Sequence, residues 1–400
     1  MHLSIAYYIT GHGLGHATRS VGIIQYLLHL GHSVSIITSL ERRFFTQNLV
    51  TNSSSSSDDE SLQYFKRTLD TGAFQTDPIT VDPLKTLDAY FRSIHLKREE
   101  IIQNELHFLK EKRFDVIVSD ATTLICRIAS MANIPCLIVS NFTWDFIYLQ
   151  MLKDISKDLS QETLLQYEEM ISMCVQDCSQ ASLLIRLPAA TPLSPAFHSS
   201  LSSPSSSCSI FEAPMVCRLA KTPSRDVRNQ LNLSGDSKVI ILAFGGHTNA
   251  KPLELKDDFL PENWICLAFG VSEDEVRGTS KFRALPFDVY MPDFIAMADV
   301  VMGKIGYGTV TECLAHGTPL IYIPRSHWPE EQYVEEYLLS YQAGVKLSAE
   351  DFYAGRWKEA VLTAAQKAET CWNIASLNAG SAIQIVGEKI VDYTAEYGRC

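Results

Sequence analysis

The chain has 400 residues, of which 46% are hydrophobic and 20% charged, and its formal net charge is −12. A chain of this length exceeds what one hydrophobic core usually organises, so we expect two domains of ordinary size. The negative charge and the lack of a basic run argue against nucleic acid as the main partner, because phosphates need Lys and Arg to neutralise them.

The sequence also lacks the usual signs of export, membrane insertion and zinc binding. Its first apolar run of about eight residues leads into glycines, and no run reaches the roughly twenty residues that a membrane span needs. The ten cysteines are scattered without a CxxC pair. We therefore expect a cytoplasmic protein without a zinc site.

The first expected element is a strand that ends in a glycine loop. Residues 3–10 are apolar, β-branched and aromatic, and Gly11–Arg19 follows them directly. Helical spacing over residues 21–28 and an apolar stretch at 34–38 complete a βαβ unit. Side chains at such a turn face the crevice at the carboxyl end of the strand.

The histidines of this loop are candidates for chemistry, because a histidine here can take a proton from an acceptor hydroxyl or donate to a leaving diphosphate. We predict His16 as the main catalytic residue, the alternative being that it only starts the helix. Arg19 either faces a phosphate or solvates the first helix. The residues expected on the acceptor side of the site are His12, Gly13, Gly15 and Arg19.

The loop matches neither of two common nucleotide-binding fingerprints. Its glycines are Gly11, Gly13 and Gly15, and Ser39 and Leu40, rather than an acid, close the following strand. No Lys-Ser/Thr pair follows the loop either. NAD and ATP are therefore not expected as its ligands.

Two further strands, at 114–120 and 136–140, are expected to end in polar side chains at the same edge of the sheet. Asp120 is either a general base next to the catalytic histidine or a helix cap. Trp144 either stacks on an acceptor sugar or is a buried core aromatic. We place Asp120 among the catalytic candidates, and Trp144 and Asp145 among those lining the acceptor side.

Two serine-rich stretches, at 51–59 and 194–209, are expected to be surface loops, which we favour over phosphorylation sites. The second lies just before a linker near residues 214–223. We therefore predict two domains, 1–215 and 216–400. The second opens with an apolar strand from residue 239 that leads into Gly245, Gly246 and His247.

A strand, glycine turn, helix and strand follow over residues 298–323. Gly306 and Gly308 supply backbone that accepts positive φ, and the free N–H groups of the next helix suit an anion such as a diphosphate. Glu312 is expected in the first helical turn, where a carboxylate repels phosphate and so accepts hydrogen bonds from neutral hydroxyls. A diphosphate with vicinal hydroxyls describes a nucleotide-sugar. The alternative for Glu312 is ordinary complementation of the helix dipole.

Several of these segments carry a family resemblance. The second half resembles the family 28 glycosyltransferases of the GT-B type through Ala298–Val301, Gly306, Gly308–Thr309, Thr311–Glu312, His316–Pro319 and Glu331–Gln332. Nearly the whole chain resembles the glycosyltransferase-like N-terminal region of plant L-arabinokinases through Tyr7–Arg19, Ser140–Tyr148 and Gly303–Glu312.

The resemblance implies an α/β GT-B architecture, with two doubly wound Rossmann-like domains facing across a cleft and the last helix crossing back to the first. It implies a donor in the second domain, with Glu312 on the ribose, Gly306–Thr309 on the diphosphate, Glu331 and Gln332 on the sugar, and uridine as the base. The donor-binding candidates are Gly245, Gly246, His247, Gly306, Tyr307, Gly308, Thr309, Glu312, Glu331 and Gln332.

We therefore predict a glycosyltransferase that uses a UDP-sugar and an acceptor whose identity the sequence does not reveal. A non-catalytic nucleotide-sugar sensor and a nucleotide-sugar epimerase are the alternatives. No cofactor is expected, and no metal, because no acidic DxD pair closes a strand and a helix N-terminus can hold a leaving diphosphate. The arabinokinases continue into a sugar-kinase domain, and since this chain ends at Cys400 we expect no kinase activity.

Overall fold

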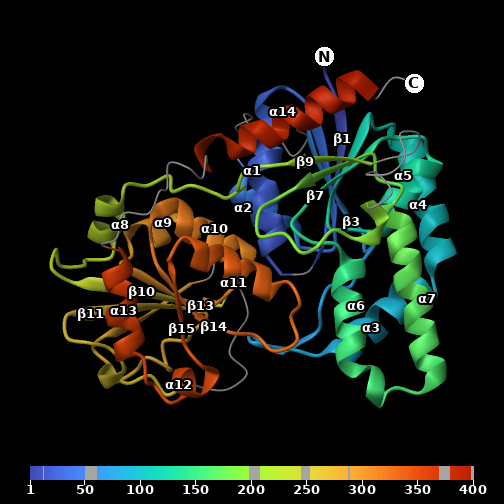
Figure 1. The fold of residues 1–400 in the computed structure, drawn as a ribbon. Helices are drawn as coiled ribbons and strands as arrows, with labels where there is room; N and C mark the ends of the chain where they lie inside the picture. The colour runs from blue at the N-terminus through green and yellow to red at the C-terminus, as the bar shows by residue number, and fades with distance from the viewer. Residues whose placement is uncertain are drawn as a thin grey trace. The chain divides into compact units, whose positions relative to one another are not determined.

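The computed structural model describes residues 1–11, 13–49, 61–197, 208–244, 253–286, 289–368 and 379–397. The chain forms two compact units (Figure 1). Unit 1 comprises Met1–Phe74, Asp82–Val216 and Ser381–Cys400, and unit 2 comprises Gln75–Val81 and Cys217–Gly380. The main division, between Val216 and Cys217, falls one residue after the predicted boundary.

Unit 1 contains a parallel seven-stranded sheet in the order β3-β2-β1-β6-β7-β8-β9. Its strands are β1 (Ser4–Ile9), β2 (Ser33–Thr38), β3 (Leu62–Lys66), β6 (Val116–Asp120), β7 (Cys136–Ser140), β8 (Leu183–Arg186) and β9 (Ser209–Glu212). The central strands are buried and rich in Ile, Val and Leu, as parallel strands covered on both faces must be. The register pairs Ile9 with Asp120, so the glycine loop begins beside the end of β6.

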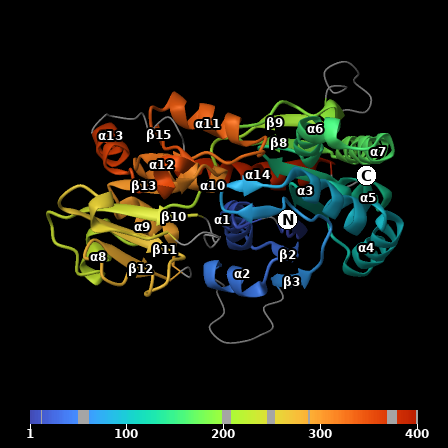
Figure 2. The ribbon, with the colours of Figure 1, turned by 90° about the horizontal axis from the view of Figure 1, so that it is seen from below.

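Helices cover both faces of this sheet, with α1 and α14 on one and α4, α5 and α7 on the other (Figure 1 and Figure 2). The helices are α1 (Gly15–His29), α2 (Arg42–Asn48), α3 (Pro83–Tyr90), α4 (Arg98–Lys112), α5 (Leu124–Met131), α6 (Trp144–Ile155), α7 (Gln161–Cys178) and α14 (Ala379–Tyr397), with a π-helical turn η1 (Phe91–His95) and a short 3₁₀ turn η2 (Ser156–Asp158). The last helix packs on the first, since Tyr26 donates to Glu388 at 3.2 Å and a Cβ at Gly387 would lie 2.4 Å from the Tyr26 ring.

Unit 2 contains a parallel six-stranded sheet in the order β12-β11-β10-β13-β14-β15. Its strands are β10 (Lys238–Ala243), β11 (Trp264–Phe269), β12 (Phe282–Leu285), β13 (Val300–Lys304), β14 (Leu320–Ile323) and β15 (Gly344–Lys346). A Cβ at Gly303 would lie 1.9 Å from the carbonyl oxygen of Ala243, so only glycine allows β13 to pass β10 at this point.

Helices α8 (Ser224–Gln230), α9 (Met291–Met297), α10 (Tyr307–His316) and α11 (Glu331–Ser340) lie on one face of the unit 2 sheet, and α12 (Ala349–Tyr353) and α13 (Lys358–Ala368) on the other (Figure 1). A short 3₁₀ turn, η4 (Asp257–Phe259), precedes β11. The aromatic side chains of Phe352 and Trp357 stack at 5.4 Å between their ring centroids and join the core beneath α13.

A small hairpin from the first half of the chain groups with unit 2. Strands β4 (Gln75–Asp77) and β5 (Thr80–Val81) pair with each other, and Ile79 is buried in the core of unit 2. Ser326 donates its N–H to Ile79 at 3.0 Å and accepts from the Val81 N–H at 3.3 Å. The predicted first domain, residues 1–215, included this segment, because nothing in its few residues shows which core receives Ile79.

The predicted fold class, α/β with two doubly wound parallel sheets, is confirmed. Within the described ranges, no helix is long and apolar enough to cross a membrane.

Candidate functional site

The glycine loop of unit 1 places His16 at the start of α1. Gly13 has a φ of 62°, and α1 begins at Gly15, so His16 stands in the first turn. A Cβ at Gly11 would lie 1.8 Å from the Oγ of Ser39, which explains the need for glycine there. The predicted acceptor-side residue His12 lies outside the described residues.

His16 belongs to a buried network with Asp120 and Arg19. The Nδ1 atom of His16 lies 2.8 Å from Oδ1 of Asp120. Arg19 donates to both carboxylate oxygens of Asp120, through Nε at 2.8 Å and through Nη2. Ser20 donates to the same carboxylate at 2.9 Å, and Arg19 also donates to Oδ1 of Asn141 at 2.7 Å. The structure thus brings together His16, Arg19 and Asp120, residues that the sequence analysis selected from two separate segments.

These contacts determine the tautomer of His16. Burial alone would raise the pKa of Asp120, but Arg19 and His16 hold it well below its usual range, so this side chain is an ionised acceptor. Nδ1 must then carry the proton, because an unprotonated Nδ1 would set a lone pair against the carboxylate. Nη2 of Arg19, 3.0 Å from Nδ1, has acceptors in Asp120 and in Ser140 at 3.2 Å. Nε2 of the neutral ring is therefore the basic nitrogen.

The structure excludes the helix-cap role for Asp120 and the solvent-facing role for Arg19. Helix α5 begins at Leu124 after Thr123, so Asp120 does not cap it. Arg19 is buried rather than solvating the surface of α1. Ala121 has a φ of 66°, a conformation costly for a residue with a Cβ, and it follows the carboxylate directly.

Trp144 and Asp145, predicted on the acceptor side, are both buried. Trp144 stacks on Tyr148 with 5.1 Å between ring centroids and an interplanar angle of 24°. Its ring meets that of Phe142 edge-on at 5.4 Å, and the Phe142 ring in turn meets that of His16 edge-on at 5.3 Å. Asp145 accepts a hydrogen bond from Ser194. These placements favour the core-aromatic alternative for Trp144.

The structure adds one carboxylate that the sequence analysis missed. Asp70 is buried and accepts from Thr10 at 2.9 Å and Thr122 at 3.1 Å, the residues that follow β1 and closely follow β6. The usable signal was its place: Asp70 stands four residues after Lys66, the end of β3, at the same edge of the sheet.

In unit 2, helix α10 begins after Gly306. Its first intrahelical hydrogen bond runs from the Val310 N–H to the Gly306 oxygen at 3.0 Å, so the N–H groups of Tyr307, Gly308 and Thr309 precede the bonded ladder. A Cβ at Gly306 would have no neighbour within 4 Å. The space beside Gly306 at this helix end is therefore open.

The predicted role of these glycines in positive φ was wrong. Gly306 has a φ of −123°, and neither it nor Gly308 is among the glycines with positive φ. What Gly306 provides is space rather than a left-handed turn. The other predicted donor-binding glycines, Gly245 and Gly246, lie outside the described residues together with His247.

Glu312 lies deeper in α10 than predicted. Because the helix begins at Tyr307 rather than Thr309, its first turn holds no acid and Glu312 falls in the second. The dipole-complement alternative therefore loses its basis. Arg218 donates to Oε1 of the buried Glu312 at 2.8 Å, and its guanidinium lies 5.3 Å from the centre of the Tyr290 ring.

Glu331 opens α11 and is held by Arg325 at two points. The Arg325 N–H donates to Oε1 at 2.7 Å and its Nε to Oε2 at 2.8 Å. Gln332, the next residue, is exposed. Lys304 ends β13 nearby, and burial, reinforced by the charge of Arg325, lowers the pKa of Lys304 to about 7. Unit 1 thus has a histidine suited to proton transfer. Unit 2 has backbone N–H groups and carboxylates suited to an anion that carries hydroxyl groups.

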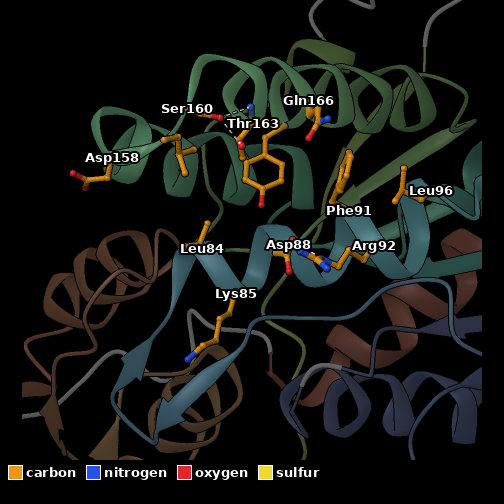
Figure 3. A pocket seen from close by; sticks show the side chains of 12 residues that line it. Leu84, Lys85, Asp88, Phe91, Arg92, Leu96, Asp158, Ser160, Thr163 and Gln166 are labelled. Carbon is orange, nitrogen blue, oxygen red and sulfur yellow. Dashed lines mark hydrogen bonds and ion pairs between the residues drawn. The ribbon is translucent and has the colours of Figure 1, made fainter.

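Two further observations concern metal ligands and grooves. In the part of the chain that the structure describes, no three His, Cys, Asp or Glu side chains gather as metal ligands would. A groove of about 640 Å³ between α3 and α7 is lined by Leu84, Phe91, Arg92, Thr163 and other residues (Figure 3), and none of them belongs to the His16 network.

Two family models match the chain. The model of glycosyl transferase family 1 matches residues 3–181, which include His16 and Asp120. The model of the glycosyltransferase family 28 C-terminal domain matches residues 265–380, which include Gly306, Glu312 and Glu331.

Two curated proteins are similar to the chain over long segments. L-arabinokinase of Arabidopsis thaliana is 35% identical over 356 residues, which are 89% of this chain and 31% of that protein. The UDP-N-acetylglucosamine–N-acetylmuramyl-(pentapeptide) pyrophosphoryl-undecaprenol N-acetylglucosamine transferase of Aquifex aeolicus (strain VF5) is 30% identical over 112 residues, or 26% of this chain and 32% of that protein. The chain thus spans about a third of the length of these relatives.

Solved structures show the same fold at low identity. The glycotransferase of kitacinnamycin is 15% identical, with a TM-score of 0.65 and 98% of each chain covered. Phytolacca americana UGT2, complexed with UDP-2fluoro-glucose and pterostilbene, is 13% identical with a TM-score of 0.62 over 100% of each chain. The chain therefore has the GT-B glycosyltransferase fold, and its second half matches glycosyltransferase family 28, as the sequence resemblance predicted. The match of its first half to glycosyl transferase family 1 was not predicted.

Proposed function

We propose that the chain transfers a sugar from a nucleoside-diphosphate sugar, with a UDP-sugar as donor, to the hydroxyl of an acceptor. The observation that carries this proposal is the buried His16–Asp120 pair at the glycine loop, with Nδ1 and Oδ1 2.8 Å apart. A histidine held in one tautomer by an ionised carboxylate is the arrangement of a general base.

In the proposed step, Nε2 of His16 takes the proton of the acceptor hydroxyl. The acceptor oxygen bonds to the anomeric carbon while the bond from that carbon to the diphosphate oxygen breaks, and its electron pair leaves with the diphosphate. Asp120 stabilises the imidazolium that forms. Arg19 keeps Asp120 ionised and, through its bonds to Asn141 and Ser140, fixed in place.

The proposed donor site is in unit 2. The N–H groups of residues 307–309 would bind the diphosphate, Glu312 the ribose hydroxyls, and Glu331 with Gln332 the sugar. Arg218 and Arg325 offset the carboxylate charges that would otherwise repel a diphosphate. Because a helix N-terminus and backbone donors suffice for this task, the proposal includes neither a metal nor a cofactor.

Support for uridine comes from the similar proteins. The Aquifex aeolicus relative is named for UDP-N-acetylglucosamine, and Phytolacca americana UGT2 is solved with UDP-2fluoro-glucose. The glycosyltransferase VinC, at 12% identity and a TM-score of 0.59, is solved with dTDP, so the fold by itself allows another base.

Calorimetric titration with UDP and dTDP tests the donor site. We expect UDP to bind the full chain and Glu312→Ala to weaken binding about tenfold or more, since each hydrogen bond to a charged group contributes roughly 1.5–3 kcal/mol. Glu359→Ala, which removes an exposed acid of α13, is the control. Binding of neither nucleotide, or UDP binding unchanged by Glu312→Ala, would contradict the site.

A second candidate is a non-catalytic nucleotide-sugar sensor. The observation that favours it is the similarity, over 89% of this chain, to a protein named for a kinase activity. A sensor would bind the UDP-sugar and leave it intact in the presence of every acceptor, whereas a transferase would release UDP.

A further inference from the structure

Asp70 is a buried carboxylate that the proposed reaction does not yet use. It is 5% exposed, and both of its oxygens accept hydroxyl hydrogen bonds, Oδ1 from Thr10 and Oδ2 from Thr122. Two hydroxyl donors converging on one carboxyl group stabilise its ionised form.

The partners of Asp70 belong to the two segments that carry the catalytic pair. Thr10 links β1 to the glycine loop of His16, and Thr122 follows Asp120 by two residues. The Thr10 N–H also donates to the backbone carbonyl oxygen of Asp120 at 3.2 Å. This bond joins the same two segments through their backbones. Asp70 therefore fixes the loop and the strand end relative to each other from the segment that follows β3.

Charge balance gives Asp70 a second role. Three charged groups interact with His16: Asp120 from β6, Arg19 from α1, and Asp70 beyond β3. Arg19 and Asp120 cancel each other, so a proton taken up by His16 leaves one positive charge in a buried cluster. An ionised Asp70 brings that sum to zero, and burying a balanced set of charges costs much less than burying an unbalanced one.

We propose that Asp70 is a positioning residue for His16, which holds the glycine loop against β6 and supplies the counter-charge when the ring takes up the acceptor's proton. This inference rests on the proposed function. No proton moves to Asp70 in the step: the ring becomes a cation, and the carboxylate remains ionised beside it. Burial raises the pKa of Asp70, while Thr10, Thr122 and the His16 charge oppose that rise, so the two side chains are electrostatically coupled.

The test compares His16 ring titrations by NMR in the unchanged chain and in Asp70→Asn. Asparagine keeps the shape and removes the charge, so we expect the midpoint of the His16 titration to move to lower pH by about one unit. UDP affinity should stay the same, since the donor binds in unit 2. If transfer is measurable, its pH profile should move with the midpoint. Restoring the charge with Asp70→Glu should recover at least part of the shift.

Glu105→Gln is the matched control. Glu105 is another buried carboxylate of unit 1, 2% exposed, and it accepts from the Tyr8 hydroxyl at 2.6 Å and from Arg67 at 2.9 Å. It is not part of the His16 network. Its substitution should leave the His16 midpoint in place, and an equal shift in this variant would overturn the proposal.

A second measurement covers the case in which Asp70→Asn does not fold. Coupling is reciprocal, so His16→Gln should move the titration of the Asp70 carboxyl carbon to higher pH. If this carbon titrates identically with and without His16, or if a folded Asp70→Asn leaves the His16 midpoint unmoved, Asp70 is not the counter-charge. Absence of transfer with every donor and acceptor would instead contradict the proposed function, and would leave the titration result unchanged.

Discussion

The two candidate sites use their carboxylates in different ways. In unit 1, one carboxylate, Asp120, is shared by His16, Arg19 and Ser20. In unit 2, Glu312 and Glu331 are held separately, by Arg218 and by Arg325. A shared carboxylate fixes a histidine tautomer for proton transfer. Separate ion pairs hold the two carboxylates in place as hydrogen-bond acceptors and neutralise their charges. This arrangement suits the sugar hydroxyl groups of a ligand that also carries a diphosphate.

The largest expected effect comes from removing the histidine of the shared network. We expect His16→Ala to lower turnover by ~10²–10⁴-fold, the usual loss of a general base, with UDP affinity unchanged because the proposed donor site lies in the other unit. Steady-state kinetics and calorimetry measure the two quantities. His29→Ala, at the exposed end of the same helix, is the control and should leave both unchanged. Turnover that survives His16→Ala would mean that the ring only starts α1.

Next in size is the effect of Asp120 on stability. Asp120→Asn leaves Arg19 buried without its anion, so we expect the free energy of unfolding at pH 7 to fall by about 3–5 kcal/mol. The folded-state pKa of Asp120 lies below its unfolded value of about 3.9, so this contribution is present above pH 4 and lost as the pH falls through the folded value. Urea unfolding of both proteins at several pH values gives the difference. A gap below about 1 kcal/mol at pH 7 would show that the network contributes little.

A smaller effect, on donor affinity, is expected from Lys304 in unit 2. Burial, reinforced by the charge of Arg325, lowers the pKa of Lys304 to about 7. The ammonium form predominates below that pH, so affinity for a UDP-sugar should fall about 3- to 10-fold as the pH rises from about 6 to 8. Calorimetry with UDP-glucose is suitable, because both of its phosphates are esterified and neither titrates in this range. Lys304→Met should abolish the pH dependence and Lys346→Met, at the end of β15, should retain it. A pH-dependent affinity that persists in Lys304→Met would assign it to another group.

The smallest effect concerns the backbone next to Asp120. Ala121 has a φ of 66°, so Ala121→Gly should raise the free energy of unfolding by about 1 kcal/mol. Ala129→Gly, inside α5, should lower it by about the same amount. Urea unfolding measures both. Destabilisation by both changes would mean that the left-handed turn at Ala121 stores no strain.

Local pattern was enough to predict the central strands of both units. The apolar run before Gly11 and the strand ending in Asp120 lie in a parallel sheet, and this topology brings their carboxyl ends together as predicted. The contact between His16 and Asp120 could be predicted because the carboxyl ends of parallel strands lie at the same edge of a sheet.

The remaining features depend on contacts between distant segments. Arg218 lies 94 residues before its partner Glu312, so no local spacing identifies this pair. Arg325 precedes Glu331 by only six residues, but the two meet across the turn between β14 and α11, where no helical or strand period applies. Asp70 was missed because it follows β3 in an irregular stretch, where side-chain direction has no periodic signal. Trp144 was placed toward the acceptor because an aromatic at a strand end has the same local pattern whether it faces a ligand or the core.

The most direct test of the account is a transfer assay with the full chain. Purified protein is incubated with UDP-sugars and a panel of small-molecule, glycan, lipid and protein acceptors, and products are detected by mass. We expect an acceptor whose mass rises by one sugar residue, with UDP released in equal amount and the product lost in His16→Ala. Tight UDP-sugar binding without any such product across the panel would contradict it and favour the sensor.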